Sequence, residues 1–348
     1  MLLIAFSGVQ LHAQAISSEL DLTAGYSGEE IGAAASQIRL FGEAPARVVF
    51  FVEAAWGDRR AGDAPVLGER LSGVDPIGTD VFGAAHPYSG RVVVMEAFAE
   101  KYFKPGGALL GVRAGRFRTP FGIYHRTDHG YSGFLRPPLI RYDGYFGLSN
   151  NWLEEGVTLT VGMPQLFIEG SVSRPHDVGF AKRRNGTDGS IRLQGYRGAF
   201  VAGVSYARSN PYLSPRFAVG RQAFAGADVR WAHSSGVQAR GELLKGHSYE
   251  GVSTTGWYVD GFLHRPGMGP FTVAVRGESL VYTAPSPRAR SANRLTLGTR
   301  VRWPGPVTLQ LNYLRQHGDL PHIKKHALDF SATYSIRLDH QFTSSRVH

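Results

Sequence analysis

Near its end, within residues 326–342, the chain alternates between apolar and polar side chains. One set is Leu328, Phe330, Ala332, Tyr334, Ile336 and Leu338, and the other is Asp329, Ser331, Thr333, Ser335, Arg337 and Asp339. Because successive side chains of a β-strand point to opposite faces, this run predicts a strand with one apolar and one polar face. Such a strand suits a soluble β-protein, and it equally suits a barrel that meets lipid outside and water inside.

The alternation repeats along the chain and predicts sixteen strands. Most are about as long as the 9 to 11 residues that a tilted strand needs to cross a bilayer. The predicted strands span residues 19–27, 35–42, 46–57, 90–104, 108–118, 153–163, 165–174, 189–196, 199–208, 223–233, 236–247, 254–264, 270–281, 293–303, 306–316 and 326–342.

The connections between these strands alternate between short and long. The short ones lie at residues 43–45, 105–107, 163–165, 197–198, 234–235, 266–269 and 304–306, and the notable long ones at 58–89, 119–152, 175–188, 209–222, 282–292 and 317–325. A soluble sandwich has no physical reason to sort its connections in this way. Outer-membrane barrels do, because short periplasmic turns and long extracellular loops join an even number of antiparallel strands. The pattern therefore predicts an all-β transmembrane antiparallel barrel in a bacterial outer membrane.

Composition agrees with that fold and removes several alternatives. The mean hydropathy is −0.17, and the chain has no run of about 18 apolar residues, so it is not a helical membrane protein. A closed barrel is the other way to satisfy all backbone polar groups in lipid. The chain has 0 cysteines, which excludes disulfides, thiolate metal sites and cysteine nucleophiles.

The first residues have the form of an export signal. The apolar run Met1–Gly8 precedes Ala13-Gln14-Ala15, a small-x-small cleavage motif. We expect residues 1–15 to be a signal peptide and residues 16–348 to form one barrel domain; the alternative for residues 1–15 is a first buried strand. The net charge of +10 suits nucleic acid, anionic lipid or anionic solutes, and export argues against nucleic acid.

Charged side chains fall on the parity opposite to the apolar ones. The arginines of this set are Arg39, Arg192, Arg230, Arg240, Arg276, Arg300, Arg302 and Arg337. An arginine that faces lipid at mid-depth costs about 2 to 4 kcal/mol, so we expect these side chains to face the inside. Because about 16 strands leave an aqueous channel, we expect a pore. Arg113 has the outward parity, which indicates either a subunit contact or a shifted register.

The 119–152 connection is rich in arginines, aromatic residues and histidines. Long loops in compact proteins are usually functional or disordered, and the aromatic content favours a folded loop. We expect it to fold into the barrel as a constriction. The arginines predicted to contact anions there are Arg116, Arg118, Arg126, Arg136 and Arg141.

The string GRFRTPFG, residues 115–122, resembles the strand-to-loop signature of the phosphate-selective porin O and P-like family. The resemblance also includes the export signal, the strand count and the aromatic final strand. It implies a barrel of 16 strands, a homotrimer and a pore that presents arginines to anions such as phosphate, with Arg116 and Arg118 beside the constriction. Two features depart from the family: lysines are scarce, and the chain continues from Phe342 to His348.

Two interpretations of the inner arginines stay open. Arginine forks bind phosphate or carboxylate, so successive arginines predict a passive channel for small hydrophilic solutes that prefers anions. Alternatively the arginines pair with acidic residues on the same faces, which predicts a non-selective general porin.

Other classes of function are less favoured by the sequence. An adhesive or structural barrel would conduct poorly, and the candidate triad Ser132, His129 and Asp128 is too close in sequence for hydrolase geometry. The pairs His125–His129 and His322–His326 lack a third metal ligand. We therefore expect no enzyme activity, no metal and no cofactor.

Overall fold

The computed structural model describes most of the strands and part of the connections. The described residues are 15–27, 31–44, 48–57, 92–123, 134–136, 138–141, 153–175, 187–209, 213–214, 217–218, 222–249, 252–283, 290–318 and 325–341. The predicted signal peptide lies outside the described residues apart from Ala15, as do Phe342 and the tail that follows it.

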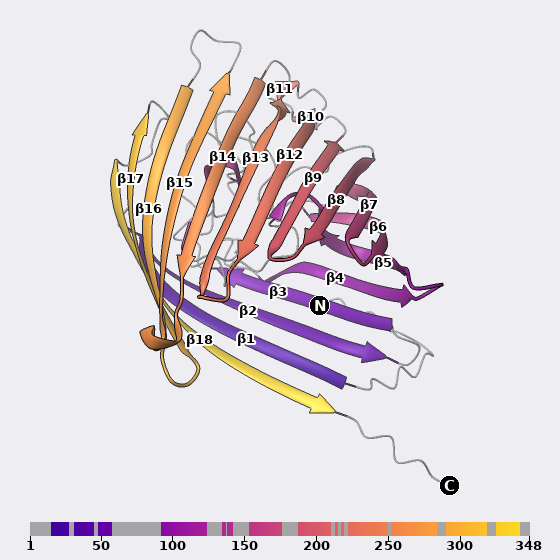
Figure 1. Ribbon diagram of the computed structural model, residues 1–348, viewed down its shortest axis with the longest axis horizontal. Helices are drawn as coiled ribbons and strands as arrows, with labels where there is room; N and C mark the ends of the chain where they lie inside the picture. Colours follow the sequence, from indigo (N-terminus) through magenta and orange to yellow (C-terminus); the bar gives the residue numbers. More distant parts are fainter. Residues whose placement is uncertain are drawn as a thin grey trace.

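Sixteen strands form one closed antiparallel barrel, in which neighbours in sequence pair and the last strand returns to the first (Figure 1). The barrel strands are β1 (Ala15–Ser27), β2 (Ile31–Ala44), β3 (Val48–Gly57), β4 (Val92–Phe103), β5 (Leu109–Arg118), β6 (Leu153–Met163), β7 (Leu166–Pro175), β8 (Asp188–Arg197), β9 (Phe200–Ser209), β12 (Gln222–Ala232), β13 (Val237–Tyr249), β14 (Val252–Leu263), β15 (Phe271–Thr283), β16 (Arg290–Arg302), β17 (Val307–Gly318) and β18 (His326–Gln341). This confirms the predicted fold class and strand count.

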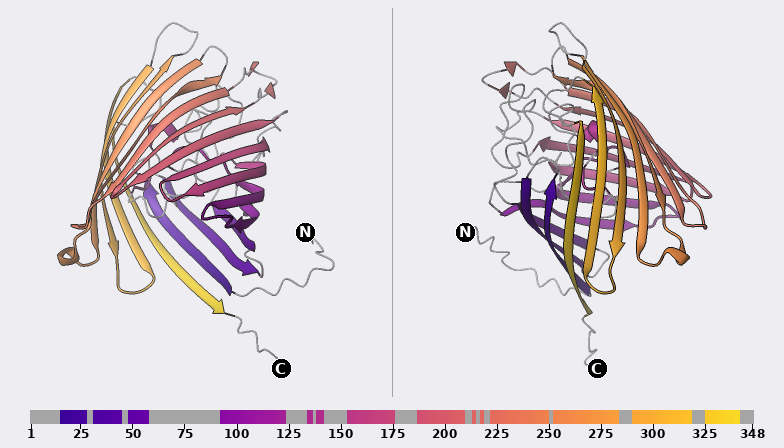
Figure 2. Two further views of the ribbon diagram at one scale, coloured as in Figure 1. Left: turned by 45° about the vertical axis from the view of Figure 1, so that its right-hand side comes forward. Right: turned by 90° about the vertical axis from the view of Figure 1, so that its left-hand side faces the viewer.

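The barrel closes where β18 lies beside β1 (Figure 2). The register runs from Ala15 opposite Gln341 to Tyr26 opposite Phe330. Closure leaves no strand with a free edge, so backbone N–H and C=O groups along the wall find partners in neighbouring strands.

The outer wall is apolar. Large side chains on one parity of most strands are exposed, with Leu159 at 59%, Val172 at 63% and Val259 at 54%. The opposite parity carries polar and charged side chains, among them Glu53, which is 2% exposed. A closed barrel with an apolar outside and a polar inside is the arrangement that a bilayer requires.

The short connections are tight turns at one end of the barrel. Gly106, Gly107 and Gly198 have φ of 54°, 89° and 57°, a region in which residues with a Cβ are strained. The turn between β14 and β15 contains the 3₁₀ turn η6 (Pro266–Met268). No helix in the described part of the chain is long and apolar enough to cross a membrane.

Two features differ from the sequence prediction. A separate small hairpin, β10 (Leu213–Ser214) with β11 (Phe217–Ala218), lies in the connection that was expected to lack strands. Arg113 faces the inside of the barrel, so its predicted outward parity was a register error. Arginines occur on both parities of β5, Arg113 on one and Arg116 and Arg118 on the other, so the sequence pattern gave no sign of the correct facing.

A charge at the middle of the outer wall should be costly. We expect Leu159→Arg to lower the free energy of unfolding in lipid or micelles by about 2 to 4 kcal/mol, because the guanidinium would face hydrocarbon. Urea unfolding followed by tryptophan fluorescence measures it. Leu159→Ala is the control for lost packing, and equal losses in the two variants would contradict the lipid-facing assignment.

Candidate functional site

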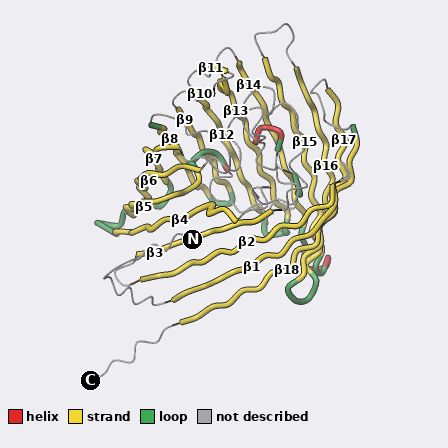
Figure 3. The backbone as a smooth tube through the Cα atoms, turned by 180° about the vertical axis from the view of Figure 1, so that it is seen from behind, coloured by secondary structure: helices red, strands yellow, loops and turns green. Residues whose placement is uncertain are grey.

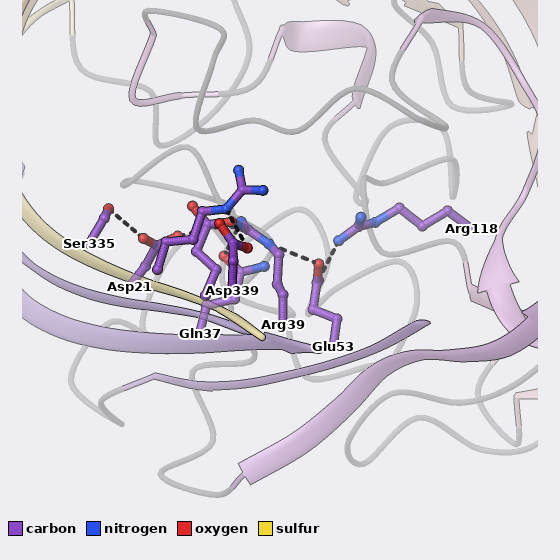
Figure 4. Close-up of polar contacts among 9 residues, drawn as sticks. Asp21, Gln37, Arg39, Glu53, Arg118, Ser335 and Asp339 are labelled. Carbon is purple, nitrogen blue, oxygen red and sulfur yellow. Dashed lines mark hydrogen bonds and ion pairs between the residues drawn. The ribbon is translucent and has the colours of Figure 1, made fainter. Parts of the chain in front are cut away.

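Two arginines join the inner wall from β1 to β5, and Ser335 on β18 donates a hydrogen bond to Asp21 on β1 (Figure 4). Arg39 on β2 lies 3.1 Å from both Glu19 and Asp21 on β1, and 3.4 Å from Glu53 on β3. Arg118, at the end of β5, contacts Glu53 at 2.7 Å and Glu96 on β4 at 2.8 Å. Glu53 therefore lies between two guanidinium groups, and one ion-pair network spans five strands.

Arg113 extends the charged wall toward β7. Its guanidinium donates to both carboxylate oxygens of Glu100 at 3.1 Å, lies 3.7 Å from Glu169, and stacks 4.6 Å from the ring centre of Phe98. Arg113 is 7% exposed. These partners explain why Arg113 faces inward, since outward placement would leave both carboxylates without their cation.

Arginines on the wall from β8 to β16 are also held by carboxylates. Arg192 binds Asp228 through two nitrogens at 2.7 and 2.9 Å. Asp260 accepts from Arg276 at 2.6 and 2.9 Å and from Arg240 at 2.9 Å, so two arginines share one carboxylate. On the next pair of strands, Arg294 donates to Glu278 at 2.6 Å, which gives a third buried pair.

A pocket of about 650 Å³ lies inside the barrel at the end that carries the short turns. Four arginines line it, Arg230 from β12, Arg240 from β13, and Arg300 and Arg302 from β16, together with His264. None of its described lining residues is acidic. We call these four side chains the vestibule arginines, and their convergence gives the pocket a positive potential.

Arg230 is the least compensated of the vestibule arginines. It lies opposite Arg240 in the register of β12 and β13, so two like charges are adjacent. Its Nε is buried without a hydrogen-bond partner among the described residues. The nearest acidic residue along its strand, Asp228, is already bound by Arg192.

Described parts of the 119–152 connection contact the inner wall across the barrel. Near its start, Gly122 N donates to Ser205 Oγ on β9 at 3.0 Å. Farther along, Arg136 binds Asp329 on β18 at 2.6 and 2.9 Å, and Leu135 N donates to Asn312 on β17. The 3₁₀ turn η5 (Leu139–Arg141) lies against β14 and β15 inside the barrel (Figure 3).

The predicted constriction residues do not form one group. Arg118 and Arg136 reach the inner wall, as described. Arg116 lies opposite Ala97 and Glu155 in the register of β5, and its Nε and one terminal nitrogen are buried without a hydrogen-bond partner among the described residues. Its role as an anion contact stays a prediction. The backbone of Arg141 is in η5, whereas its side chain and the whole of Arg126 lie outside the described residues.

The predicted pore-lining arginines fall into three environments. Arg39 and Arg276 are bound by carboxylates, and Arg230, Arg240, Arg300 and Arg302 line the vestibule pocket. Arg337 is at the end of β18, 68% exposed, and 3.1 Å from Asp339.

Sequence reasoning missed an aromatic row on the inner wall. Phe41, Phe51 and Phe98 are direct partners across β2, β3 and β4, and the last two rings are 5.4 Å apart. Alternation alone marks them as apolar residues on a polar face, but only the register shows that they are adjacent.

No metal centre appears among the described residues. No group of three or more possible metal ligands occurs there. His326 instead lies 2.8 Å from the Tyr313 hydroxyl and stacks on its ring. His125, His129, His322 and the triad considered at Ser132 lie outside the described residues.

Comparison with solved structures identifies the type of fold. The anion-selective porin from Comamonas acidovorans superposes with a TM-score of 0.62 at 11% identity, covering 94% of this chain and 100% of that chain. OmpF of Salmonella typhi, in a complex with daunomycin, gives 0.62 at 11% identity and covers 93% and 97%. The trimer form of OmpT, an outer membrane protein of Vibrio cholerae, gives 0.59 at 8% identity and covers 93% and 99%.

These similarities establish a porin-like barrel. No family model and no curated protein matches the sequence, so the resemblance to phosphate-selective porins extends only to the fold. The porin-like fold and the apolar outer wall place the protein in the bacterial outer membrane.

The contact between Arg136 and Asp329 should hold the loop to the wall. Asp329 is 0% exposed, so Asp329→Asn leaves a buried arginine without its carboxylate and should cost about 3 to 5 kcal/mol. The loss is measured by urea unfolding in micelles. Asp339→Asn on the same strand is the control, because that exposed pair should leave the unfolding midpoint unchanged; equal effects would contradict the role of burial.

Proposed function

We propose that the protein is a porin, a passive diffusion channel for small hydrophilic solutes across the outer membrane. The polar inner wall of a 16-strand barrel supports this proposal, because that width leaves room for water. The 119–152 loop sets the size limit, since its described parts are bonded to the wall inside the barrel. Residues 1–15 act as the export signal, and neither catalysis nor a cofactor takes part.

Anion preference is the finer part of the proposal, and the vestibule arginines carry it. Four guanidinium groups line one pocket that has no acidic residue among its described lining. Guanidinium forks suit the paired oxygens of phosphate and carboxylate groups. A solute entering this vestibule meets four guanidinium groups, whose positive field raises the local concentration of anions. One fold neighbour is described as an anion-selective porin, which agrees with this sign.

A non-selective general porin is the second candidate, and the ion pairs favour it. Arg39, Arg113 and Arg118 are each bound by carboxylates on β1 to β7, and Arg192 and Arg276 by carboxylates farther along the wall. Paired charges stiffen the wall and contribute little net field. The two candidates differ in one respect, which is whether the vestibule arginines dominate ion permeation.

Reversal potentials should decide between them. In a planar bilayer with a KCl gradient, we expect the sign of an anion-selective channel, reduced toward zero in Arg230→Gln/Arg302→Gln because half of the vestibule charge is removed. The control Lys101→Gln/Arg197→Gln removes the same charge from the outer wall and should leave the potential unchanged. A cation-selective wild-type channel would contradict the proposed preference.

We also propose a homotrimer. A hollow of about 560 Å³ on the outer wall of β18, β1, β2 and β3 is lined by small and aromatic side chains, including Ala24, Ala332, Trp56 and Tyr334. An apolar hollow of this kind accepts side chains of a second copy. One fold neighbour, OmpT of Vibrio cholerae, is described in a trimer form.

Mass measurement in detergent tests the assembly. Light scattering with size exclusion should give three copies for the wild type, and Ala332→Trp should shift the protein toward monomer because it fills the hollow. Ala202→Trp, on the outer wall of β9, is the control that should remain trimeric. A monomeric wild type would contradict the proposal.

A further inference from the structure

A group of basic side chains lies on the outer wall at the end of the barrel that carries the long loops. Arg208 lies next to the end of β9, and Lys245 and His247 lie near the end of β13; all three are exposed and have outward parity. Between them, β12 contributes Ala223 opposite both Arg208 and His247. The strand spacing of about 4.8 Å puts β9 and β13 about 10 Å apart, with a floor of small side chains between them.

The small residues on the floor leave room for a ligand group between the cations. Ala225 lies opposite Lys245 on one side and opposite Tyr206 on the other, and Tyr206 is 47% exposed. A phenol and three basic groups therefore surround two alanines. Side chains of arginine and lysine are long enough to converge over a gap of this width, whereas the alanines cannot fill it.

Charge on this surface is of one sign. No outward-facing residue in the described parts of β8, β9, β12 and β13 is acidic, and neither Arg208 nor Lys245 forms an ion pair with a described residue. The inner wall differs in this respect, since most of its arginines contact carboxylates. Water can solvate a cation on an ordinary protein surface. Arg208 and Lys245 instead lie at the rim of a lipid-facing wall, where an anionic group can solvate them.

Below the basic group the same strands present a continuous apolar surface. Val204 on β9 is 53% exposed, Val229 on β12 46% and Leu243 on β13 51%. One strip of the wall is therefore apolar at mid-depth and basic at its rim. This order matches a lipid molecule, whose acyl chains lie along the hydrocarbon and whose phosphate lies at the interface.

We propose that Arg208, Lys245 and His247, with Tyr206, form a binding site for the phosphate headgroup of an anionic lipid in the outer leaflet. The phosphate lies over Ala223 and Ala225 and accepts hydrogen bonds from the basic side chains, which are charge-assisted and strong for arginine and lysine. The acyl chains pack on Val204, Val229 and Leu243. The site is separate from the pore and does not depend on the proposed transport function.

Native mass spectrometry of the full chain, released from micelles that contain phosphatidylglycerol or phosphatidylcholine, tests the proposal. We expect phosphatidylglycerol to be retained in preference to phosphatidylcholine, and its affinity to fall at least about threefold in Arg208→Gln/Lys245→Gln, because two charged donors to the phosphate are lost. Arg208→Lys/Lys245→Arg keeps both charges and should retain the lipid, which separates loss of binding from loss of fold.

The matched control is Lys101→Gln/Arg197→Gln, which removes one lysine and one arginine from the outer wall at the opposite rim. It should bind phosphatidylglycerol like the wild type. Equal retention of the two lipids, equal loss in the control variant, or full displacement of phosphatidylglycerol by millimolar inorganic phosphate would each overturn the proposal. The last result would make free phosphate, rather than lipid, the ligand of these side chains.

Discussion

The structure depends on the pairing of β18 with β1, because a bilayer offers no water to backbone groups at a free edge. Twelve residue pairs from Ala15–Gln341 to Tyr26–Phe330 close the barrel at this seam. Once the seam exists, each strand has two neighbours, and the facing of every side chain follows from its parity. Apolar groups must then lie outside, and the polar residues that solubilise the interior must lie inside. Closure thus fixes where charge is tolerated.

Where loop segments exclude water from the inside of the barrel, a charged side chain is stable only when it is paired with an opposite charge. Arg276 and Arg192 are 1% exposed, and each contacts a carboxylate through two nitrogens. Removing one partner of such a pair lowers the free energy of unfolding by more than the intact pair contributes to it, because the remaining charge stays desolvated. These contacts therefore act mainly as geometric constraints, and Arg136 with Asp329 extends the constraint to the loop. Arg230 in the vestibule pocket differs, since it lies opposite Arg240 and its Nε is buried without a hydrogen-bond partner among the described residues.

The fold was predictable from the sequence because period-2 alternation and turn residues are local signals. Strand β6 spans Leu153–Met163, the residues predicted from the pattern. The candidate site was not predictable to the same degree. In β5 both parities carry arginine, so only contacts from Glu100 and Glu169 on other strands decide that Arg113 faces inward. The vestibule pocket joins Arg230 with Arg302, which are far apart in sequence and adjacent only through the barrel register.

Arginine illustrates how depth and facing assign different roles to one side chain. At mid-barrel and inward, as at Arg113, it needs two carboxylates and an aromatic ring to be stable. At the inward rim, as at Arg230, water can enter the pocket, so a deficit of carboxylates persists and creates a field. At the outward rim, as at Arg208, hydrocarbon ends and phosphate begins, and the cost of a cation falls toward zero. Barrel closure makes charge costly at the centre of the outer wall. Cationic side chains such as Arg230 therefore lie at the inward rim, which faces the pore, and others such as Arg208 at the outward rim, which faces lipid headgroups.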